Sequence, residues 1–316
     1  MRISVRCSRR KFTRALSVVV AVLVLTACGT GDGSSGPGGS SAAATPGADT
    51  RKIVTTTTVF ADIVQNIGGS RVSTTSIIPP GVGPEDYEPK PDDAKKLADA
   101  TLIVSNGVGL DNFLDDLLAS GSGGDTPRLV LGDGIPILTV DGQENPHFWL
   151  DPTIVKEYYL PAIASRLGEL DPDGRATYDA NMTAFGAELD ALDAELKTEI
   201  ATIPEANRKL VTFHDAFPYF SRHFGFEEVG VIIQNVGQEP TAGELATLVE
   251  KVKSAGVRAV FSEAQFNPDL TRTLAQEAGV TNVVTTLYND SLGPAPADSY
   301  VGLMRWNVDQ IVPALK

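Results

Sequence analysis

The sequence predicts an α/β fold of two lobes, each a small parallel sheet flanked by helices, joined by one long rigid helix. Residues 171–204 form an unbroken helical pattern, and short apolar runs alternate with helical patterns both before and after it, which predicts parallel sheets. About 30 helical residues span roughly 45 Å, more than one compact domain usually needs. The alternative is a long surface helix of a single domain. The apolar stripe consists of Tyr178, Met182, Phe185, Leu189, Leu192, Leu196 and Ile200.

Residues 1–27 read as a signal peptide rather than as part of the fold. A basic segment from Arg2 to Arg14 precedes an apolar run over 15–27, and the run is shorter than the ~20 residues that a membrane-spanning anchor needs. The run ends in Leu-Thr-Ala before Cys28, which resembles the lipobox at which bacterial lipoproteins are cleaved and acylated. We therefore expect a mature chain that is lipid-anchored at Cys28 and faces the extracytoplasmic side of the cell membrane.

The segment 28–50 is rich in glycine, serine, alanine and proline, which predicts a flexible tether. Cys7 leaves with the signal peptide and Cys28 carries lipid, so no disulfide is expected. Loss of the six basic residues of the signal peptide takes the formal net charge from −14 to −20. Such a chain repels nucleic acid, and its plausible small ligands are cations or neutral molecules.

The first lobe is expected over residues 51–170. Its valine- and threonine-rich runs predict strands, a run of prolines and glycines at 79–84 predicts a rigid connection, and the last helix leads into the long one. The predicted strands are 52–60, 72–78, 101–105, 129–131 and 137–140, the predicted helices are 61–67, 91–100, 110–118 and 152–170, and 141–146 is a predicted loop.

The second lobe is expected over residues 205–316, after a linking helix at 171–204. Thr241 and Glu244 have the spacing of a capping box, which marks the start of one of its helices. The predicted strands are 210–213, 229–233, 258–261 and 282–287, and the predicted helices are 218–224, 241–255, 270–278 and 300–315.

Two of the three histidines, His147 and His214, lie in loops at strand ends, one in each lobe. Loops at the carboxyl ends of parallel strands form the ligand crevice of such sheets. Glu85 and Asp290 follow strands in the same way, so two imidazoles and two carboxylates could surround a divalent cation. The local pattern leaves open that each histidine is only a hydrogen-bonding partner.

A series of stretches along the chain is similar to the signatures of one family, the zinc- and manganese-binding lipoproteins that supply metal ATP-binding-cassette (ABC) importers. The stretches are GVGPEDYEP at 81–89, NGVGL at 106–110, PHFWLDP at 146–152, FHDAFPYF at 213–220, and DSLG at 290–293 followed by Ser299 and Tyr300. The resemblance as a whole extends over nearly all of the mature chain.

The resemblance implies a metal held between two lobes by one ligand from each of four loops, at Glu85, His147, His214 and Asp290. It implies Zn²⁺ or Mn²⁺ as cargo, a membrane permease as partner, and a monomer that is not an enzyme. The family usually has histidine at the position of Glu85, so neighbouring Asp86 is an alternative first ligand. The chain lacks the histidine-rich loop of many zinc-specific members, which removes one indication of zinc.

Other residues have simpler interpretations. Glu263 resembles an acidic position that lies near the metal without binding it, Tyr87 and Trp149 are expected to shape the pocket walls, and His223 is expected to pack or to lie at the surface. The acidic run 111–116 is expected to form a solvated helix face.

Two other functions remain as alternatives. A zinc-dependent hydrolase would keep an open metal position beside a general base, and the chain has no His-Glu-x-x-His helix and no Gly-x-Ser-x-Gly turn. A surface adhesin or a binder of an organic solute would have a pocket with more aromatic and neutral polar groups.

Overall fold

The computed structural model describes residues 50–85, 87–119, 123–234 and 236–316. The predicted signal peptide, Cys28 and the tether up to residue 49 lie outside these ranges, as does Asp86. The described residues form one compact unit. Among the described residues, no helix is both long enough and apolar enough to cross a membrane.

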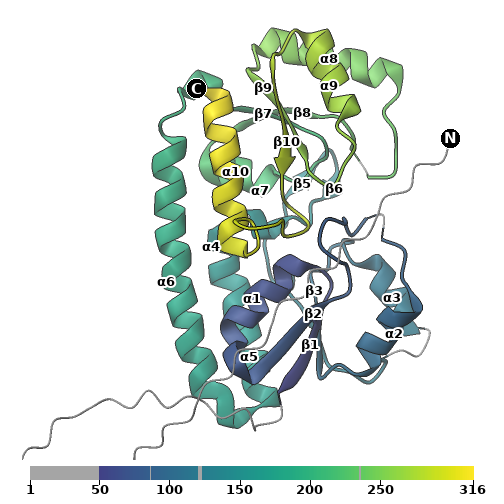
Figure 1. The fold of residues 1–316 in the computed structure, drawn as a ribbon, viewed down its shortest axis with the longest axis vertical. Helices are drawn as coiled ribbons and strands as arrows, with labels where there is room; N and C mark the ends of the chain where they lie inside the picture. The colour runs from purple at the N-terminus through teal and green to yellow at the C-terminus, as the bar shows by residue number, and fades with distance from the viewer. Residues whose placement is uncertain (1–49, 86, 120–122, 235) are drawn as a thin grey trace, which may run out of the picture. The chain divides into compact units, whose positions relative to one another are not determined.

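The first sheet has four parallel strands in the order β2-β1-β3-β4. Successive side chains of a strand point to opposite faces: Ile53 packs with helix α1, and Val54 packs with α2 and α3. This sheet and its helices are called the first lobe below (Figure 1). The strands are β1 Arg51–Thr55, β2 Val72–Ser76, β3 Leu102–Ser105 and β4 Arg128–Val130, and the helices are α1 Thr58–Gly68, α2 Pro91–Ala98 and α3 Asn112–Ala119.

The second lobe is built around two parallel strand pairs, β7 with β8 and β9 with β10, and β7 lies beside β9 (Figure 1). Helices α8 and α9 pack on one face of these strands, and α7 and α10 pack on the other. The strands are β7 Lys209–Thr212, β8 Glu227–Val231, β9 Ala259–Glu263 and β10 Asn282–Leu287, and the helices are α7 Pro218–Phe224, α8 Ala242–Ala255, α9 Asp269–Ala278 and α10 Tyr300–Leu315.

Helix α6, Arg175–Ile200, runs past both lobes (Figure 1). It packs against α1 and α10 of the two lobes and against α5, Leu160–Leu170, which precedes it in the chain. Its predicted apolar stripe faces the core, with Met182 half-buried and the other members buried. The helix has 26 residues, or roughly 39 Å, and is shorter than predicted. It begins later because Asp171 accepts hydrogen bonds from Arg71 and Tyr178 ahead of a 3-10 turn at Pro172–Gly174. The expected fold class is confirmed.

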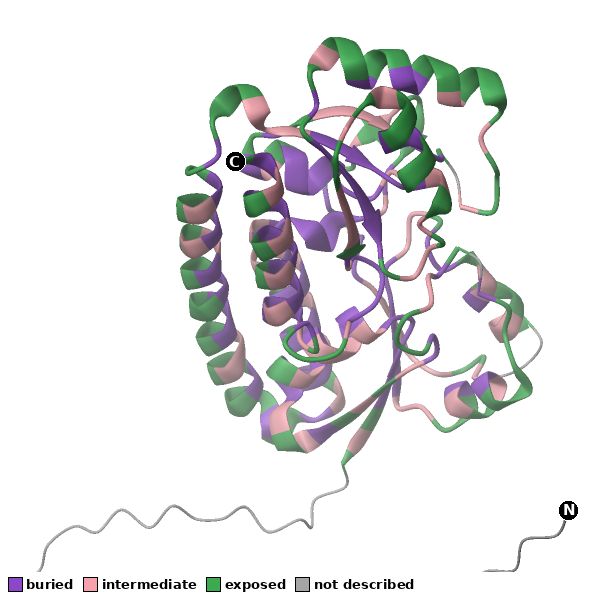
Figure 2. Cartoon of the chain, turned by 45° about the horizontal axis from the view of Figure 1, so that its top comes forward, coloured by how far each residue is buried: buried purple, intermediate pink, exposed green. Residues whose placement is uncertain are grey.

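One hydrophobic core continues through both lobes and under α6, from Ile53 of β1 to Leu315 of α10. Figure 2 shows the buried residues on the inner side of α6 and along the strands. Two smaller cores lie on the outer faces of the sheets, one beneath α2 and α3 and one beneath α8 and α9. Because the main core is shared, the two lobes pack as one body.

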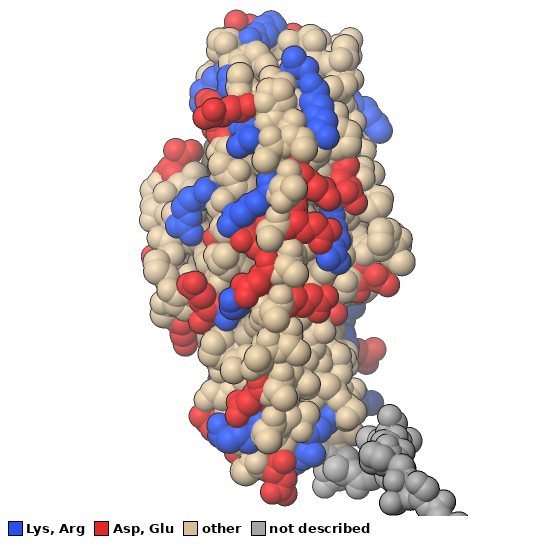
Figure 3. Space-filling model, turned by 90° about the vertical axis from the view of Figure 1, so that its left-hand side faces the viewer, with Lys and Arg blue, Asp and Glu red and all other residues tan. Residues whose placement is uncertain are grey.

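The outer side of α6 carries charges of both signs, with many acidic side chains (Figure 3). Lys156 pairs with Asp190 at 2.6 Å, and Arg305 pairs with Glu195 at 2.7 Å, so ion pairs fasten α6 to its neighbours. Exposed pairs of this kind contribute only about 0–1 kcal/mol each. The shared core, rather than surface charge, therefore holds α6 in place.

Three sequence predictions were wrong in detail. The strand expected at 52–60 ends at Thr55, because the Thr57 carbonyl accepts the first helical hydrogen bond, from Ala61, at 3.2 Å. Val59 and Phe60 thus fill helix positions despite their preference for strands.

The loop expected at 141–146 contains the second strand of an antiparallel hairpin, β5 Thr139–Val140 with β6 Gln143–Glu144. Asp141 and Gly142 both have positive φ, as a tight hairpin turn requires. The helix expected at 152–170 is α4 Pro152–Ile154 and α5 Leu160–Leu170 with a π-helical turn at Val155–Tyr159 between them. Pro161 has no N–H to continue the α-helical register, which accounts for the wider turn.

Candidate metal centre

Four loops bring the predicted site residues together between the lobes. His214 lies two residues after β7, Asp290 lies three residues after β10, His147 lies three residues after the β5–β6 hairpin, and Glu85 lies between β2 and α2. The loops of Glu85, His214 and Asp290 start at the ends of parallel strands, where such sheets place their ligands. The loop of His147 instead follows an antiparallel hairpin. One ligand atom from each of the four residues lies within 4.8 Å of the other three.

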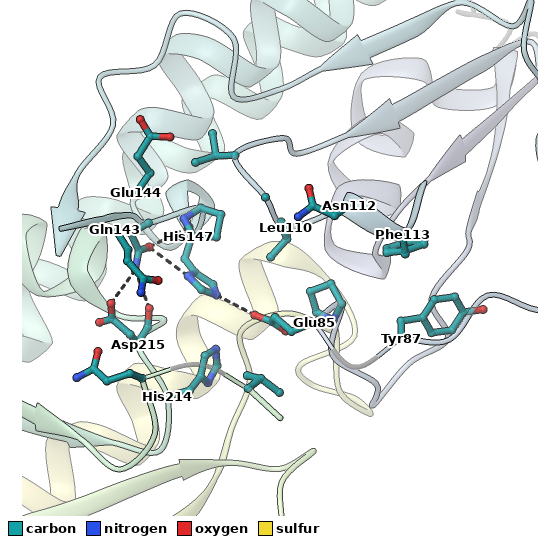
Figure 4. Close-up of a pocket in the computed structure, with 17 residues that line it drawn as sticks. Glu85, Tyr87, Leu110, Asn112, Phe113, Gln143, Glu144, His147, His214 and Asp215 are labelled. Atoms are coloured by element: carbon teal, nitrogen blue, oxygen red, sulfur yellow. Dashed lines mark hydrogen bonds and ion pairs between the residues drawn. The ribbon is translucent and has the colours of Figure 1, made fainter. Parts of the chain in front are cut away.

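The distances inside this cluster suit ligands around a common centre. The Nε2 atom of His147 lies 3.5 Å from Oδ1 of Asp290 and 3.7 Å from Oε1 of Glu85, and Nε2 of His214 lies 3.8 Å from Oδ2 of Asp290. Both imidazoles and Asp290 are buried, whereas Glu85 is exposed. In Figure 4 the carboxylate of Glu85 points toward the ring of His147. Asp86 is outside the described residues.

The loop of Glu85 passes close to the cluster at Gly83. A β-carbon there would lie 3.3 Å from Oε2 of Glu85 and 3.7 Å from Oδ2 of Asp290. A larger residue would crowd both carboxylates, so glycine lets this loop approach the site.

Asn145 orients the ring of His147. The Asn145 Oδ1 atom accepts the backbone N–H of His147 at 3.1 Å and lies 3.1 Å from Nδ1 of its ring. An acceptor at Nδ1 places the ring proton there and leaves the lone pair of Nε2 facing the cluster. This Nε2 atom is buried and has no other hydrogen-bond partner among the described residues.

Glu263 lies beside the ring of His214, at ion-pair distance but without a hydrogen bond. Its Oε1 atom lies 3.1 Å from Nδ1 of His214, and both side chains are buried. The placement agrees with the expectation that Glu263 lies near the site without joining it. The Nδ2 atom of Asn289 lies 3.2 Å from Nε2 of His214, the ring nitrogen on the side of Asp290.

The charges of the cluster shift the pKa values of all four residues. Burial opposes a charge on the imidazoles, but Asp290 and Glu85 raise the pKa of His147, and Glu263, Asp290 and Glu85 raise that of His214 to about 10. Burial and the charge of Glu85 raise the pKa of Asp290. Although burial opposes it, the histidines lower the pKa of Glu85. Buried carboxylates thus draw positive charge to the centre, and a cation would displace protons from the imidazoles.

A cavity of about 540 Å³ opens from one side of the cluster. Its walls include Tyr87, as expected, together with Asn112, Gln143 and Asp215 (Figure 4). Gln234 also lines it. Trp149 is fully buried and is not among the lining residues; its ring packs 5.2 Å from that of His147, on the core side. The cluster therefore has a solvent side at the cavity and an apolar side at Trp149.

One expectation outside the cluster was wrong, for Asp111, and one was incomplete, for His223. Asp111 is buried and accepts a hydrogen bond from the backbone N–H of Gly107 at 2.6 Å, so the acidic run does not form a uniformly solvated face. His223 is mostly buried and lies 3.3 Å from Asp151 and 2.5 Å from Asp193, which makes it a bridge between α7, α6 and the segment after His147. An imidazole with a carboxylate at each nitrogen has a partner on both sides, which sequence spacing did not indicate.

Sequence reasoning also missed three amide side chains that surround the cluster: Asn145, Gln265 and Asn289. The Nε2 atom of Gln265 donates hydrogen bonds to Oδ2 of Asp290 at 2.9 Å and to Oδ1 of Asn289 at 3.2 Å. Asn145 and Asn289 each lie one or two positions from a predicted ligand, which was the only available signal.

The fold consists of two parallel-sheet lobes along one long helix, and four loops bring two imidazoles and two carboxylates together between the lobes. This combination defines the class of solute-binding proteins that hold a metal ion between lobes. The chain belongs to the family described as "Zinc-uptake complex component A periplasmic", whose model matches residues 53–314.

Known proteins of this kind match nearly the whole chain. The manganese-binding lipoprotein MntA of Halalkalibacterium halodurans is 32% identical over 312 residues, covering 97% of this chain and 99% of the relative. The iron ABC transporter substrate-binding lipoprotein MtsA of Streptococcus pyogenes is 29% identical over 320 residues, with 97% and 99% coverage.

Solved structures give the same result. The periplasmic zinc-binding protein TroA from Treponema pallidum is 29% identical and superposes with a TM-score of 0.77 over 84% of this chain and 99% of its own. A periplasmic metal-binding protein from Candidatus Liberibacter asiaticus is 25% identical, with a TM-score of 0.76 over 84% of this chain and 100% of its own. Proteins of this family are transport components that work with a membrane permease.

Proposed function

We propose that this protein captures a divalent cation at Glu85, His147, His214 and Asp290 and delivers it to the permease of an ABC importer. The observation that carries the proposal is the pair His147 Nε2 and Asp290 Oδ1. These atoms are buried 3.5 Å apart, and neither has a hydrogen-bond partner among the described residues. Buried polar atoms without partners are costly, and a bound cation would satisfy both.

The cargo is Zn²⁺ or Mn²⁺. Two imidazoles suit zinc, and two carboxylates make the site more tolerant of manganese. Relatives are named for manganese, zinc and iron. The Irving–Williams order places zinc above manganese for almost any site of nitrogen and oxygen ligands, so the purified protein should bind zinc more tightly.

The proposed localisation follows from the amino-terminal sequence and from the relatives. Acylation at Cys28 would anchor the mature chain to the outer side of the cell membrane, and the tether 28–50 would let the folded part reach the permease. The matched relatives are named lipoproteins. We further propose lobes at 51–170 and 205–316 joined by the segment 171–204, of which α6 is the long helical part. We also propose a monomer that binds no nucleic acid because of its acidic surface.

The proposed role does not involve catalysis. A zinc hydrolase needs a coordination position for water, whereas four protein ligands fill a tetrahedral site. An organic-solute binder would use the cavity of about 540 Å³ beside the cluster, but Glu85, Glu144 and Asp215 make its lining acidic. Capture of a metal ion is the role that accounts for both the unpartnered ligand atoms, His147 Nε2 and Asp290 Oδ1, and the acidic cavity beside them.

Elemental analysis of the protein purified without chelator tests the proposal. We expect one zinc or manganese per chain, and removal by a chelator followed by titration should restore one ion. An organic molecule in place of metal would support the solute-binder alternative, and zinc-dependent hydrolysis of esters or peptides would support the hydrolase.

A further inference from the structure

We propose that Gln265 sets the metal preference of the site by limiting Asp290 to one coordinating oxygen. The inference rests on the proposed function, since it concerns the same four residues. Gln265 follows β9 and is not itself one of the four, so it would act through Asp290 as a positioning residue.

The two oxygens of Asp290 have different surroundings. Oδ2 accepts a hydrogen bond from Nε2 of Gln265 at 2.9 Å, whereas Oδ1 has no hydrogen-bond partner among the described residues and lies 3.5 Å from Nε2 of His147. Asp290 is fully buried, so solvent does not reach Oδ2 to replace the amide. Oδ1 is therefore free to bind a cation, while Oδ2 must first give up its donor.

The neighbours of Gln265 fix the orientation of its amide. Its Nε2 atom lies 2.9 Å from Oδ2 of Asp290 and 3.2 Å from Oδ1 of Asn289, and both of these are acceptors. If the amide were turned over, its own oxygen would face two oxygens. The Nδ2 atom of the same Asn289 faces Nε2 of His214, so a single chain of hydrogen bonds joins His214, Asn289, Gln265 and Asp290.

Gln265 also separates Asp290 from the surface. It lines a shallow hollow with Tyr288, Gly293 and Pro80, none of which lines the main cavity. The side chain is half-buried, so its amide reaches inward while the residue borders solvent. A replacement should therefore keep the volume of glutamine, because a smaller residue would admit water to Oδ2.

The number of oxygens from Asp290 bears directly on metal choice. Zinc is satisfied by four ligands in a tetrahedron, which monodentate Asp290 completes together with His147, His214 and Glu85. Manganese favours more oxygen ligands and higher coordination, which a bidentate carboxylate provides. By holding Oδ2, Gln265 would favour zinc.

The test compares the native protein with Gln265→Met, which keeps the length of the side chain and removes the donor. Gln276→Met is the matched control, because Gln276 is exposed on α9 of the same lobe. Affinities for Zn²⁺ and Mn²⁺ are measured by competition with a chromophoric chelator. X-ray absorption of the zinc-loaded proteins counts the oxygen ligands. Gln265→Leu is a second donor-free variant should the first fold poorly.

We expect the ratio of zinc to manganese affinity to fall about 10-fold in Gln265→Met, with one more oxygen ligand per zinc and no change in Gln276→Met. An unchanged ratio would overturn the inference, whether both affinities stay the same or fall together. Failure of the proposed function would look different, since the native protein would then bind neither metal.

Discussion

Trp149 of the first lobe donates its indole N–H to the backbone carbonyl of Asn289 in the second lobe, at 2.9 Å. Trp149 lies two residues after His147, and Asn289 directly precedes Asp290, so this hydrogen bond joins two of the loops that form the cluster. The hydroxyl of Tyr300 donates to the carbonyl of Trp149 at 2.7 Å and strengthens the same junction. The lobes are therefore fastened on the core side of the cluster and open on the cavity side.

Trp149→Phe should loosen that junction. The change keeps an aromatic ring but leaves the Asn289 carbonyl without its donor, at a cost of about 1–3 kcal/mol. We expect a lower melting temperature and faster metal dissociation, measured by stopped-flow chelation. Trp306→Phe is the control, because Trp306 donates to Thr286 near the surface; it should leave metal dissociation unchanged. Equal dissociation rates in both variants would contradict a role for the Trp149 bond at the cluster.

His147→Ala and His214→Ala should each weaken metal binding by at least about 100-fold, because each removes an imidazole that faces the centre. Isothermal titration with zinc measures the effect. His223→Ala is the comparison, since His223 pairs with Asp151 and Asp193 instead. It should lower the melting temperature with much less effect on affinity. Equal losses of affinity from all three changes would refute the assignment.

Stability of the metal-free protein should fall as the pH rises from about 4.5 to about 7, partly because of Glu228. Burial, with the nearby charge of Asp215, raises the pKa of Glu228 from 4.5 to about 7, although Ser221 donates to its carboxylate at 3.0 Å. Between these two values the folded state holds a proton that the unfolded chain has lost, so the free energy of unfolding decreases with pH.

Glu228→Gln should remove this contribution. Between pH 4.5 and pH 8 the free energy of unfolding of the variant should therefore drop by about 1–3 kcal/mol less than that of the native protein. Urea unfolding at several pH values measures it. Glu227→Gln, at the exposed neighbouring position, is the matched control. The same pH dependence in Glu228→Gln and in the native protein would show that Glu228 is not responsible.

The fold and the four clustered residues could be predicted because both depend on the succession of strands, helices and loops along the chain. Strand and helix patterns alternate clearly, and the ranges of α7, β10 and α10 agree with the predicted ones. The roles of Gln265 and Asn289 could not be predicted in this way. Both are neutral amides with no characteristic spacing, and their contacts form only when the loops after β9 and β10 meet. The ion pairs of His223 could not be predicted for the same reason, since its carboxylate partners come from distant segments.

Cys28→Ala should release the protein from the membrane fraction without changing its affinity for metal, because the anchor and the cluster are separate parts of the chain. Cell fractionation with immunodetection measures the first effect, and titration of the purified variant measures the second. Ser35→Ala, within the tether, should leave the protein in the membrane fraction. Retention of the Cys28→Ala variant at the membrane would contradict lipid anchoring at this residue.

Glu85→His should widen the preference for zinc over manganese. The native cluster offers two imidazoles and two carboxylates, and the change replaces an anionic oxygen by a nitrogen, which suits zinc better than manganese. Glu85 is the exposed member of the cluster, so the new ring has room at the cavity. Competition titrations should show the zinc-to-manganese affinity ratio rising by on the order of 10-fold. Glu144→His, at an exposed position of the cavity wall, should leave the ratio near its native value. If the ratio does not move in Glu85→His, then Asp86 or water completes the metal site in place of Glu85.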